Sequence, residues 1–248
     1  METSSRESQD FRVHDTAALF DSAYLNDTIR LRYQPLIWVH DDWLRNQDHI
    51  GFLRALGTPK AQAQVAKTLH LNSILAPELF EDPIKRLLFL SGASLQHLLE
   101  ILGLVCFRQQ LELLIEKSTI DMLNKRFNAN DLEFVQQKSR LLVSQLPDCM
   151  ISLRPLSSDG SINNPPLLAF GCHLLKLACN NRIGQDPDPN VSNWQYYLKL
   201  KLPKFNELAV QELPGSKHIM TKSDWDRLRI FIKKMALDRE DSCTNLLK

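Results

Sequence analysis

The stretch from Ser94 to Asn124 constrains the fold more than any other part of the chain. Its apolar residues recur at intervals of three, four and seven, as Leu95, Leu98, Leu99, Leu102 and Cys106, then Leu111, Leu114 and Ile115. This spacing is typical of a helix, or a pair of helices, with one face in a core. The stretch contains no nucleophile–base pair, phosphate loop or metal-ligand spacing, which indicates a packing element.

Composition supports a helical fold for the rest of the chain. Glycine accounts for 8 of 248 residues, which is about half of the usual ~7%. Sheet proteins place glycine in tight turns, so its scarcity, together with abundant leucine, favours helices. We therefore expect a predominantly all-α, multi-helix globular bundle with a substantial core.

Charge and cysteine usage exclude several classes of protein. The net charge is +1, from 30 basic and 29 acidic residues, so there is no general attraction to nucleic acid or anionic lipid. No apolar run approaches the ~18 to 20 residues of a membrane span, and the polar N-terminus has no apolar h-region, so we expect no signal peptide and a cytosolic protein. The cysteines are odd in number and form no C-x-x-C, as expected of buried free thiols: Cys106, Cys149, Cys172, Cys179 and Cys243.

Helix boundaries can be predicted at several points. A helix over 47–56 stops at Gly57, and Thr58-Pro59 opens the next one, with Thr58 as N-cap. Prolines break 71–91 into short helical pieces. Later N-termini are predicted at Asn130, with Glu133 closing a capping box, at Ser192 with Gln195, and at Ser223.

Residues 194–202 are ambiguous. Alternating apolar and basic residues suit a strand, whereas Trp194, Leu198 and Leu202 suit a helix. We favour the helix, because the sequence contains no convincing second strand with which this segment could pair. A minor β element near 194–202 is the alternative.

Domain organisation is expected to be simple. Residues 1–15 and 239–248 are predicted as flexible tails, and 16–238 as a helical domain. The Pro-, Ser- and Asn-rich segment 147–166 is either a linker that divides two subdomains or a long surface loop.

Two groups of residues are candidates for a metal site. His40-Asp41-Asp42 with His49 is similar to a histidine–aspartate metal pair, but further ligands at suitable geometry are lacking. Cys172, His173 and Cys179 lie on one expected helix, where His173 points about 100° away from Cys172. Core packing accounts better for both, so we expect no catalytic residue, no metal and no cofactor.

Binding residues are expected on the last helix. Its apolar face comprises Trp225, Leu228, Ile232 and Met235. Its other side is basic and could contact an acidic partner, through Arg227, Arg229, Lys233 and Lys234. The tryptophans of the chain are either interface anchors or core residues.

Several segments, in order, resemble the SctK (YscK-like) family of the type III secretion sorting platform. Leu98 to Phe107 (LLEILGLVCF) resembles the family's central leucine run ending in Leu-Gly-Leu-Val. The other matching segments are Ala23-Tyr-Leu, His70-Leu-Asn, Pro165 to Leu177, and Trp194 through Leu198-Lys-Leu-Lys-Leu-Pro203. The colinear match covers roughly 20–235, and this chain departs from the family by a longer N-terminal tail and larger loops around Ser157 and Asp186.

The resemblance implies a cytosolic, non-enzymatic adaptor beneath the inner-membrane ring of a bacterial secretion machine. Such a protein links the cytoplasmic domain of the ring component (SctD-like) to the pod protein (SctQ-like), and indirectly the stator and the export ATPase. Two rival hypotheses remain. One is a metal-dependent helical hydrolase using His40, Asp41 and His49, and the other is a secretion chaperone or regulator that binds exported proteins.

Overall fold

The computed structural model describes residues 22–45, 50–71, 75–108, 111, 117–138, 166–180, 189–204, 221–239 and 246–247. These ranges are almost entirely helical, and none of them contains a strand. The predominantly all-α prediction is therefore confirmed. The ambiguous segment 194–202 lies mostly in a helix, as we favoured, and the alternative of a β element there is wrong.

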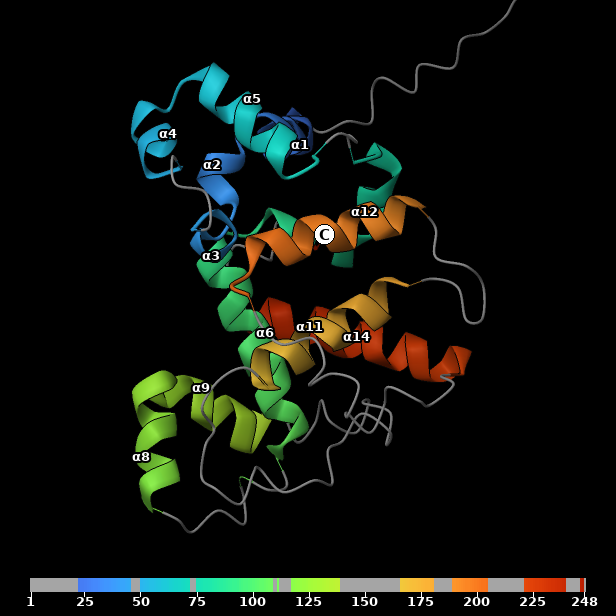
Figure 1. Ribbon diagram of the computed structural model, residues 1–248. Coiled ribbons are helices and arrows are strands. Elements are labelled where there is room, and N and C mark those ends of the chain that lie inside the picture. Colours follow the sequence, from blue (N-terminus) through green and yellow to red (C-terminus); the bar gives the residue numbers. More distant parts are fainter. Residues whose placement is uncertain are drawn as a thin grey trace, which may run out of the picture.

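Five of the helices in the described ranges lie in the N-terminal part of the structure (Figure 1). They are α1 (Ser22–Tyr33), α2 (Pro35–Trp38), α3 (Asp41–Leu44), α4 (Ile50–Leu56) and α5 (Pro59–Thr68). α1, α2 and α4 all pack against α5. The predicted helix boundaries at Gly57 and Thr58 are confirmed. Gly57 follows α4 with φ of 56°, a conformation that glycine adopts without strain. The Thr58 hydroxyl accepts the Ala61 N–H at 3.2 Å.

The remaining elements build the body of the molecule. Two short 3₁₀ helices, η2 (Pro77–Glu81) and η3 (Pro83–Phe89), occupy the proline-broken stretch as predicted. They lead into α6 (Gly92–Cys106), α8 (Lys117–Arg126), α9 (Ala129–Glu133), the π-helical turn η4 (Phe134–Lys138), α11 (Pro166–Cys179), α12 (Pro189–Lys201) and α14 (Lys222–Arg239). In Figure 1, α12 crosses between the N-terminal helices and the α11–α14 pair, and α6 runs down to α8 and α9.

α6 forms the centre of the core. The sequence predicted one buried face, but every residue from Leu98 to Phe107 is buried, because α11, α14 and η4 all pack against this helix. The contact with α11 is the most extensive in the fold. α6 has 15 residues, and no helix in the described part of the chain is both long and apolar enough to cross a membrane.

Two glycines allow α6 and α11 to approach closely. A Cβ added at Gly103 of α6 would collide with the backbone of Leu167, and one added at Gly171 of α11 would collide with the backbone of Leu99. The two helices therefore touch backbone to backbone at two places. Any side chain at either glycine would force them apart.

Three predicted helix starts need correction. α9 is capped by Asn128, not Asn130. The Asn128 Oδ1 accepts the Asp131 N–H at 2.8 Å, and the Asp131 carboxylate accepts the Asn128 N–H at 3.2 Å. The Asn128–Asp131 pair has the same spacing as the predicted one, and Asp131 is completely buried. α12 begins at Pro189, so Ser192 lies inside the helix and forms no capping box. α14 begins at Lys222, where Thr221 and Asp224 cap it reciprocally.

The tryptophans and the C-terminal end both join the core. Trp194 is completely buried, and Trp38, Trp43 and Trp225 are partly buried against the core. Leu247 is 1% exposed, a contact that the expectation of a tail over 239–248 did not include. The division into domains stays a prediction, and the linker 147–166 lies outside the described residues except for Pro166.

Candidate interaction surfaces

The outward side of α14 carries most of the predicted binding residues. The inward side is buried through Leu228, Phe231, Ile232, Met235 and Ala236. Arg227, Lys233 and Lys234 are exposed to solvent. Three of the four predicted contact residues are thus accessible on one helix, and their role in binding stays a prediction.

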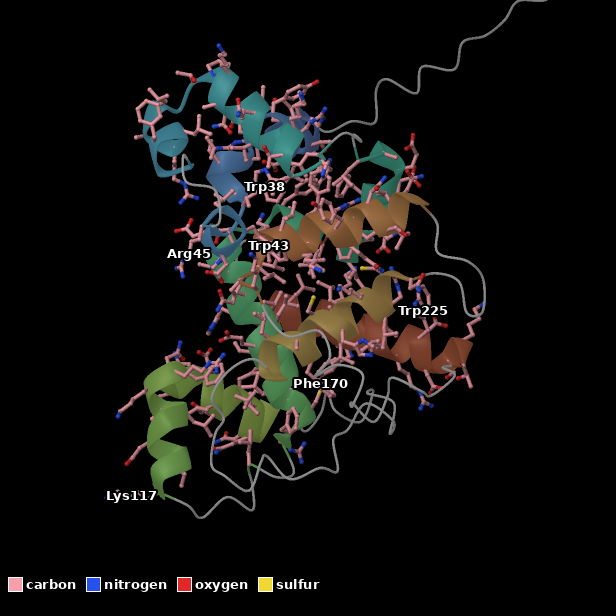
Figure 2. All side chains as sticks on the ribbon, in the orientation of Figure 1. Trp38, Trp43, Arg45, Lys117, Phe170 and Trp225 are labelled. Atoms are coloured by element: carbon pink, nitrogen blue, oxygen red, sulfur yellow. The ribbon has the colours of Figure 1, made fainter. Side chains whose placement is uncertain are left out.

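Arg229, the fourth predicted residue, points into the structure. Its guanidinium pairs with Asp82 at the start of η3, at 2.6 and 2.9 Å, and donates to the Ala178 carbonyl at 2.8 Å. It also lies over the ring of Trp225, which Figure 2 labels, with 4.5 Å from Cζ to the ring centroid. These contacts hold α14 against η3 and α11, which makes Arg229 a structural residue in this arrangement.

Two exposed apolar residues lie between the cations of α14. Ile230 is 48% exposed and Leu237 is 37% exposed, and they are seven residues, or two turns, apart. Arg227 and Lys234 lie on one side of this pair and Lys233 on the other, by the geometry of the helix. Sequence reasoning missed the pair, although two apolar residues at this spacing on a polar face were a detectable signal.

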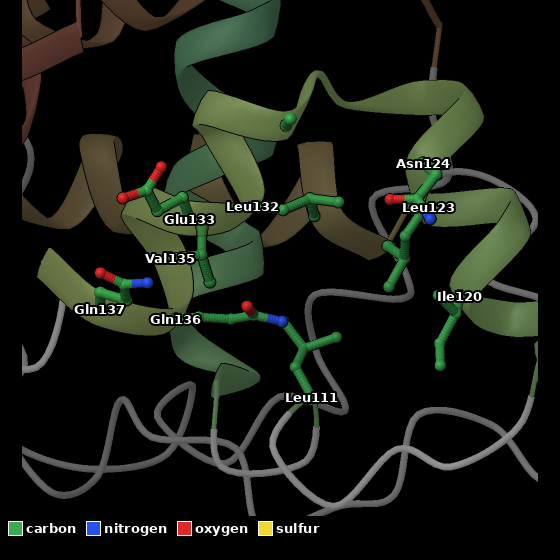
Figure 3. Close-up of a pocket in the computed structure, with 10 residues that line it drawn as sticks. Leu111, Ile120, Leu123, Asn124, Leu132, Glu133, Val135, Gln136 and Gln137 are labelled. Atoms are coloured by element: carbon green, nitrogen blue, oxygen red, sulfur yellow. The ribbon is translucent and has the colours of Figure 1, made fainter.

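A groove lies between α8 and the α9–η4 segment, with a volume of about 330 Å³. Figure 3 shows its lining side chains, which come from both segments and from the region after α6. Its apolar residues are Leu111, Ile120, Leu123, Leu132 and Val135. Its polar residues are Asn124, Glu133, Gln136 and Gln137. Sequence reasoning did not find the groove, because it depends on how two short helices pack.

Two polar side-chain contacts hold this segment onto α6. The Asp131 carboxylate lies 3.3 Å from His97 Nε2, and Arg126 donates to Glu100 at 2.9 Å. Glu100 is itself only 7% exposed. Because the acidic side chain of each pair is buried, these contacts make the docking of α8 and α9 onto α6 specific.

The residues of the metal hypothesis have other roles where the structure describes them. His40 caps α3, and its Nδ1 accepts the Asp42 N–H at 3.2 Å. Asp41 pairs with Arg54, which lowers the pKa of that carboxyl. His49 lies outside the described residues. Within the described ranges, no three His, Cys, Asp or Glu side chains gather as they would around a metal ion.

The cysteines of α6 and α11 are buried. Cys106, Cys172 and Cys179 form no disulfide and are at most 1% exposed, as the sequence predicted. Burial raises the pKa of Cys106 and Cys179, which keeps both thiols protonated and unreactive. His173 has its pKa lowered to about 4, first by burial and then by Lys176, so it is neutral at physiological pH.

Comparison with known families decides the identity of the chain. The family model described as YOP proteins translocation protein K (YscK) matches residues 27–248, from within α1 to the last residue. The chain belongs to the YscK family. The resemblance to SctK proteins is thereby confirmed, and the chain is a type III secretion protein. No curated protein and no solved structure matches it.

Proposed function

We propose that this YscK-family protein is a cytosolic, non-enzymatic adaptor of the type III secretion sorting platform. It links the cytoplasmic domain of the SctD-like inner-membrane ring protein to the SctQ-like pod protein. The observation that carries the proposal is the family match over 27–248. The adaptor role, both partners and the position beneath the ring are parts of the proposal.

The architecture supports attachment as the mechanism. One continuous cluster of buried residues runs from Leu31 to Leu247 and includes every long helix of the described chain. A body packed in this way holds its surface features at fixed separations. Figure 1 places the N-terminal helices and α8–α9 at opposite ends of the molecule, so two partners can bind without competing for one surface.

The outward side of α14 is our candidate for the contact with the pod protein. It combines the cations Arg227, Lys233 and Lys234 with the exposed Ile230 and Leu237. Apolar contact area surrounded by charge suits a protein interface, because the apolar part contributes affinity and the charges orient the partner.

The test is the triple charge reversal Arg227→Glu, Lys233→Glu and Lys234→Glu, with Arg229 left intact to preserve the fold. We expect pod-protein pull-down to fall at least tenfold while circular dichroism stays unchanged. The matched control reverses Lys60, Lys67 and Lys117, three exposed lysines on α5 and α8, and should bind as wild type. Undiminished binding by the α14 variant would reject this surface.

The adaptor function itself is tested in bacteria. Cells that lack this chain should fail to recruit the pod protein to the ring and should not secrete, and the full chain should restore both. The purified protein should co-purify with ring and pod components. Co-purification with an exported protein instead, or normal secretion by the deletion strain, would overturn the proposal.

A further inference from the structure

A second cavity of about 330 Å³ opens where the N-terminal helices meet the junction between α12 and α6. Its charged lining consists of Asp27 and Arg30 of α1 and Lys201 at the end of α12. Its apolar wall includes Ile37 and Trp38 of α2. None of the surfaces considered above includes these residues.

Lys201 is the unusual member of this lining. The residue is 4% exposed, and its ammonium donates to the Leu88 carbonyl at 2.7 Å. That carbonyl is neutral and takes one of the three ammonium protons. Burial lowers the pKa of Lys201 to about 8 while Asp27 acts in the opposite direction, so the side chain is still mostly charged at neutral pH. A buried cation of this kind costs stability unless a negative group meets it.

The cavity has an excess of positive charge. Among the described residues that line it, Asp27 is the one carboxylate. Two cations act on this carboxylate: Arg30 lies 4.0 Å from it, and Lys201 also interacts with it electrostatically. Ser91, the N-cap of α6, and Gly92, its first residue, also line the cavity. They carry the positive end of the dipole of a 15-residue helix. Lys201 and Arg30 together outnumber Asp27, so the cavity favours an anionic group.

The rim of the cavity is apolar and exposed. Ile37 lines the cavity and is 64% exposed, and the half-buried Trp38 and Phe89 also line it. A free phosphate or acetate ion would leave these side chains in water. A protein segment would cover them, and aromatic and aliphatic groups around a charged centre are typical of protein–protein interfaces.

We propose that this cavity receives the acidic side chain, Asp or Glu, of a partner protein, whose neighbouring apolar residue covers Ile37 and Trp38. The inference rests on the proposed adaptor function and adds the chemistry of one docking point. The incoming carboxylate accepts hydrogen bonds from Lys201 and Arg30. The binding energy therefore includes the compensation of a buried charge that the free chain leaves incompletely matched.

Three variants of the full chain test the cavity. Arg30→Glu reverses the accessible cation, Lys201→Met removes the buried one at similar volume, and Ile37→Asp makes the rim acidic. The matched control is Lys60→Glu, an exposed charge reversal on α5 outside the cavity. Dissociation constants are measured by calorimetry against the purified ring cytoplasmic domain and, separately, the pod protein.

We expect each of the three variants to bind the same one partner at least tenfold more weakly, and Lys60→Glu to bind within twofold of wild type. Lys201→Met removes a buried charge but also the donor to the Leu88 carbonyl, so the melting temperature and circular dichroism of each variant are measured to separate lost binding from lost folding. An Asp→Lys or Glu→Lys scan of that partner should find a position that restores binding to Arg30→Glu.

Three different outcomes would overturn the inference. If wild type binds the ring domain or the pod protein and all three variants bind equally well, the cavity proposal fails while the adaptor function stands. If wild type binds neither, the adaptor function fails and the cavity proposal falls with it. A saturable shift of the Trp38 indole NMR resonance on titration with millimolar acetate or phosphate would identify a small-anion site. If the three variants also bound the ring domain and the pod protein as wild type does, this result would reject the proposal as well.

Discussion

Arg229 of α14 forms a two-point ion pair with Asp82, which lies 147 residues earlier in the chain. Nη2 lies 2.6 Å from Oδ1 and Nη1 lies 2.9 Å from Oδ2. The side chains are 20% and 11% exposed, so solvent screens the pair little. With its further bond to the Ala178 carbonyl, this one guanidinium connects α14, η3 and α11.

Replacing Arg229 with alanine should destabilise the fold. The change leaves the Asp82 carboxylate mostly buried without its cation, and we expect the free energy of unfolding to fall by about 2 to 3 kcal/mol. Urea unfolding followed by circular dichroism measures this. Lys233→Ala, on the exposed side of the same helix, should change stability by no more than about 0.5 kcal/mol. Equal effects of the two substitutions would contradict a structural role for Arg229.

Gly103 and Gly171 should tolerate no side chain. Alanine at either position places a methyl group against the backbone of the facing helix, and the backbone moves less easily than a side chain. We expect each substitution to lower the melting temperature and to cost about 2 kcal/mol or more. Gly92→Ala is the control, because its added Cβ would lie 3.4 Å from the nearest atom, the Lys201 carbonyl oxygen. A Gly171→Ala protein as stable as wild type would show that α6 and α11 can separate freely.

Stability should fall as pH drops from about 6.5 towards 4. Burial lowers the pKa of His173 in the folded protein to about 4 from its ordinary 6.5. The unfolded chain therefore binds a proton in this range that the folded chain does not, and proton uptake favours unfolding. The contribution is on the order of 3 kcal/mol. It is measured by urea unfolding across the range, with His173→Gln as the comparison. An identical pH slope for the variant would contradict this assignment.

The described cysteines should be protected from modification in the native state. Cys106, Cys172 and Cys179 are buried, and burial raises the pKa of Cys106 and Cys179, so thiolate is scarce at neutral pH. In a Cys149→Ser and Cys243→Ser background, we expect a thiol reagent to react only after denaturant is added. Rapid reaction of the native variant would mean that α6 or α11 opens readily.

Local sequence patterns were enough to predict most of the helices. Apolar spacing placed α6, α11 and α14, and Thr58-Pro59 placed the start of α5, because periodicity and capping involve residues within a few positions of each other. The same reasoning chose Asn130 as a cap where Asn128 serves. Both candidates satisfy the local rule, and the buried contact of Asp131 with His97 distinguishes the observed one.

The sequence by itself determined that this chain is helical and which residues of most helices face inward, and its motif order indicated the YscK family. Only the tertiary structure decided that Arg229 turns inward to Asp82, that Gly103 and Gly171 face opposing backbones, and that Lys201 lies buried at a cavity. The physical reason is distance along the chain. Helix periodicity is set by neighbours three and four residues away, whereas these contacts join residues whose proximity exists only once the helices have packed.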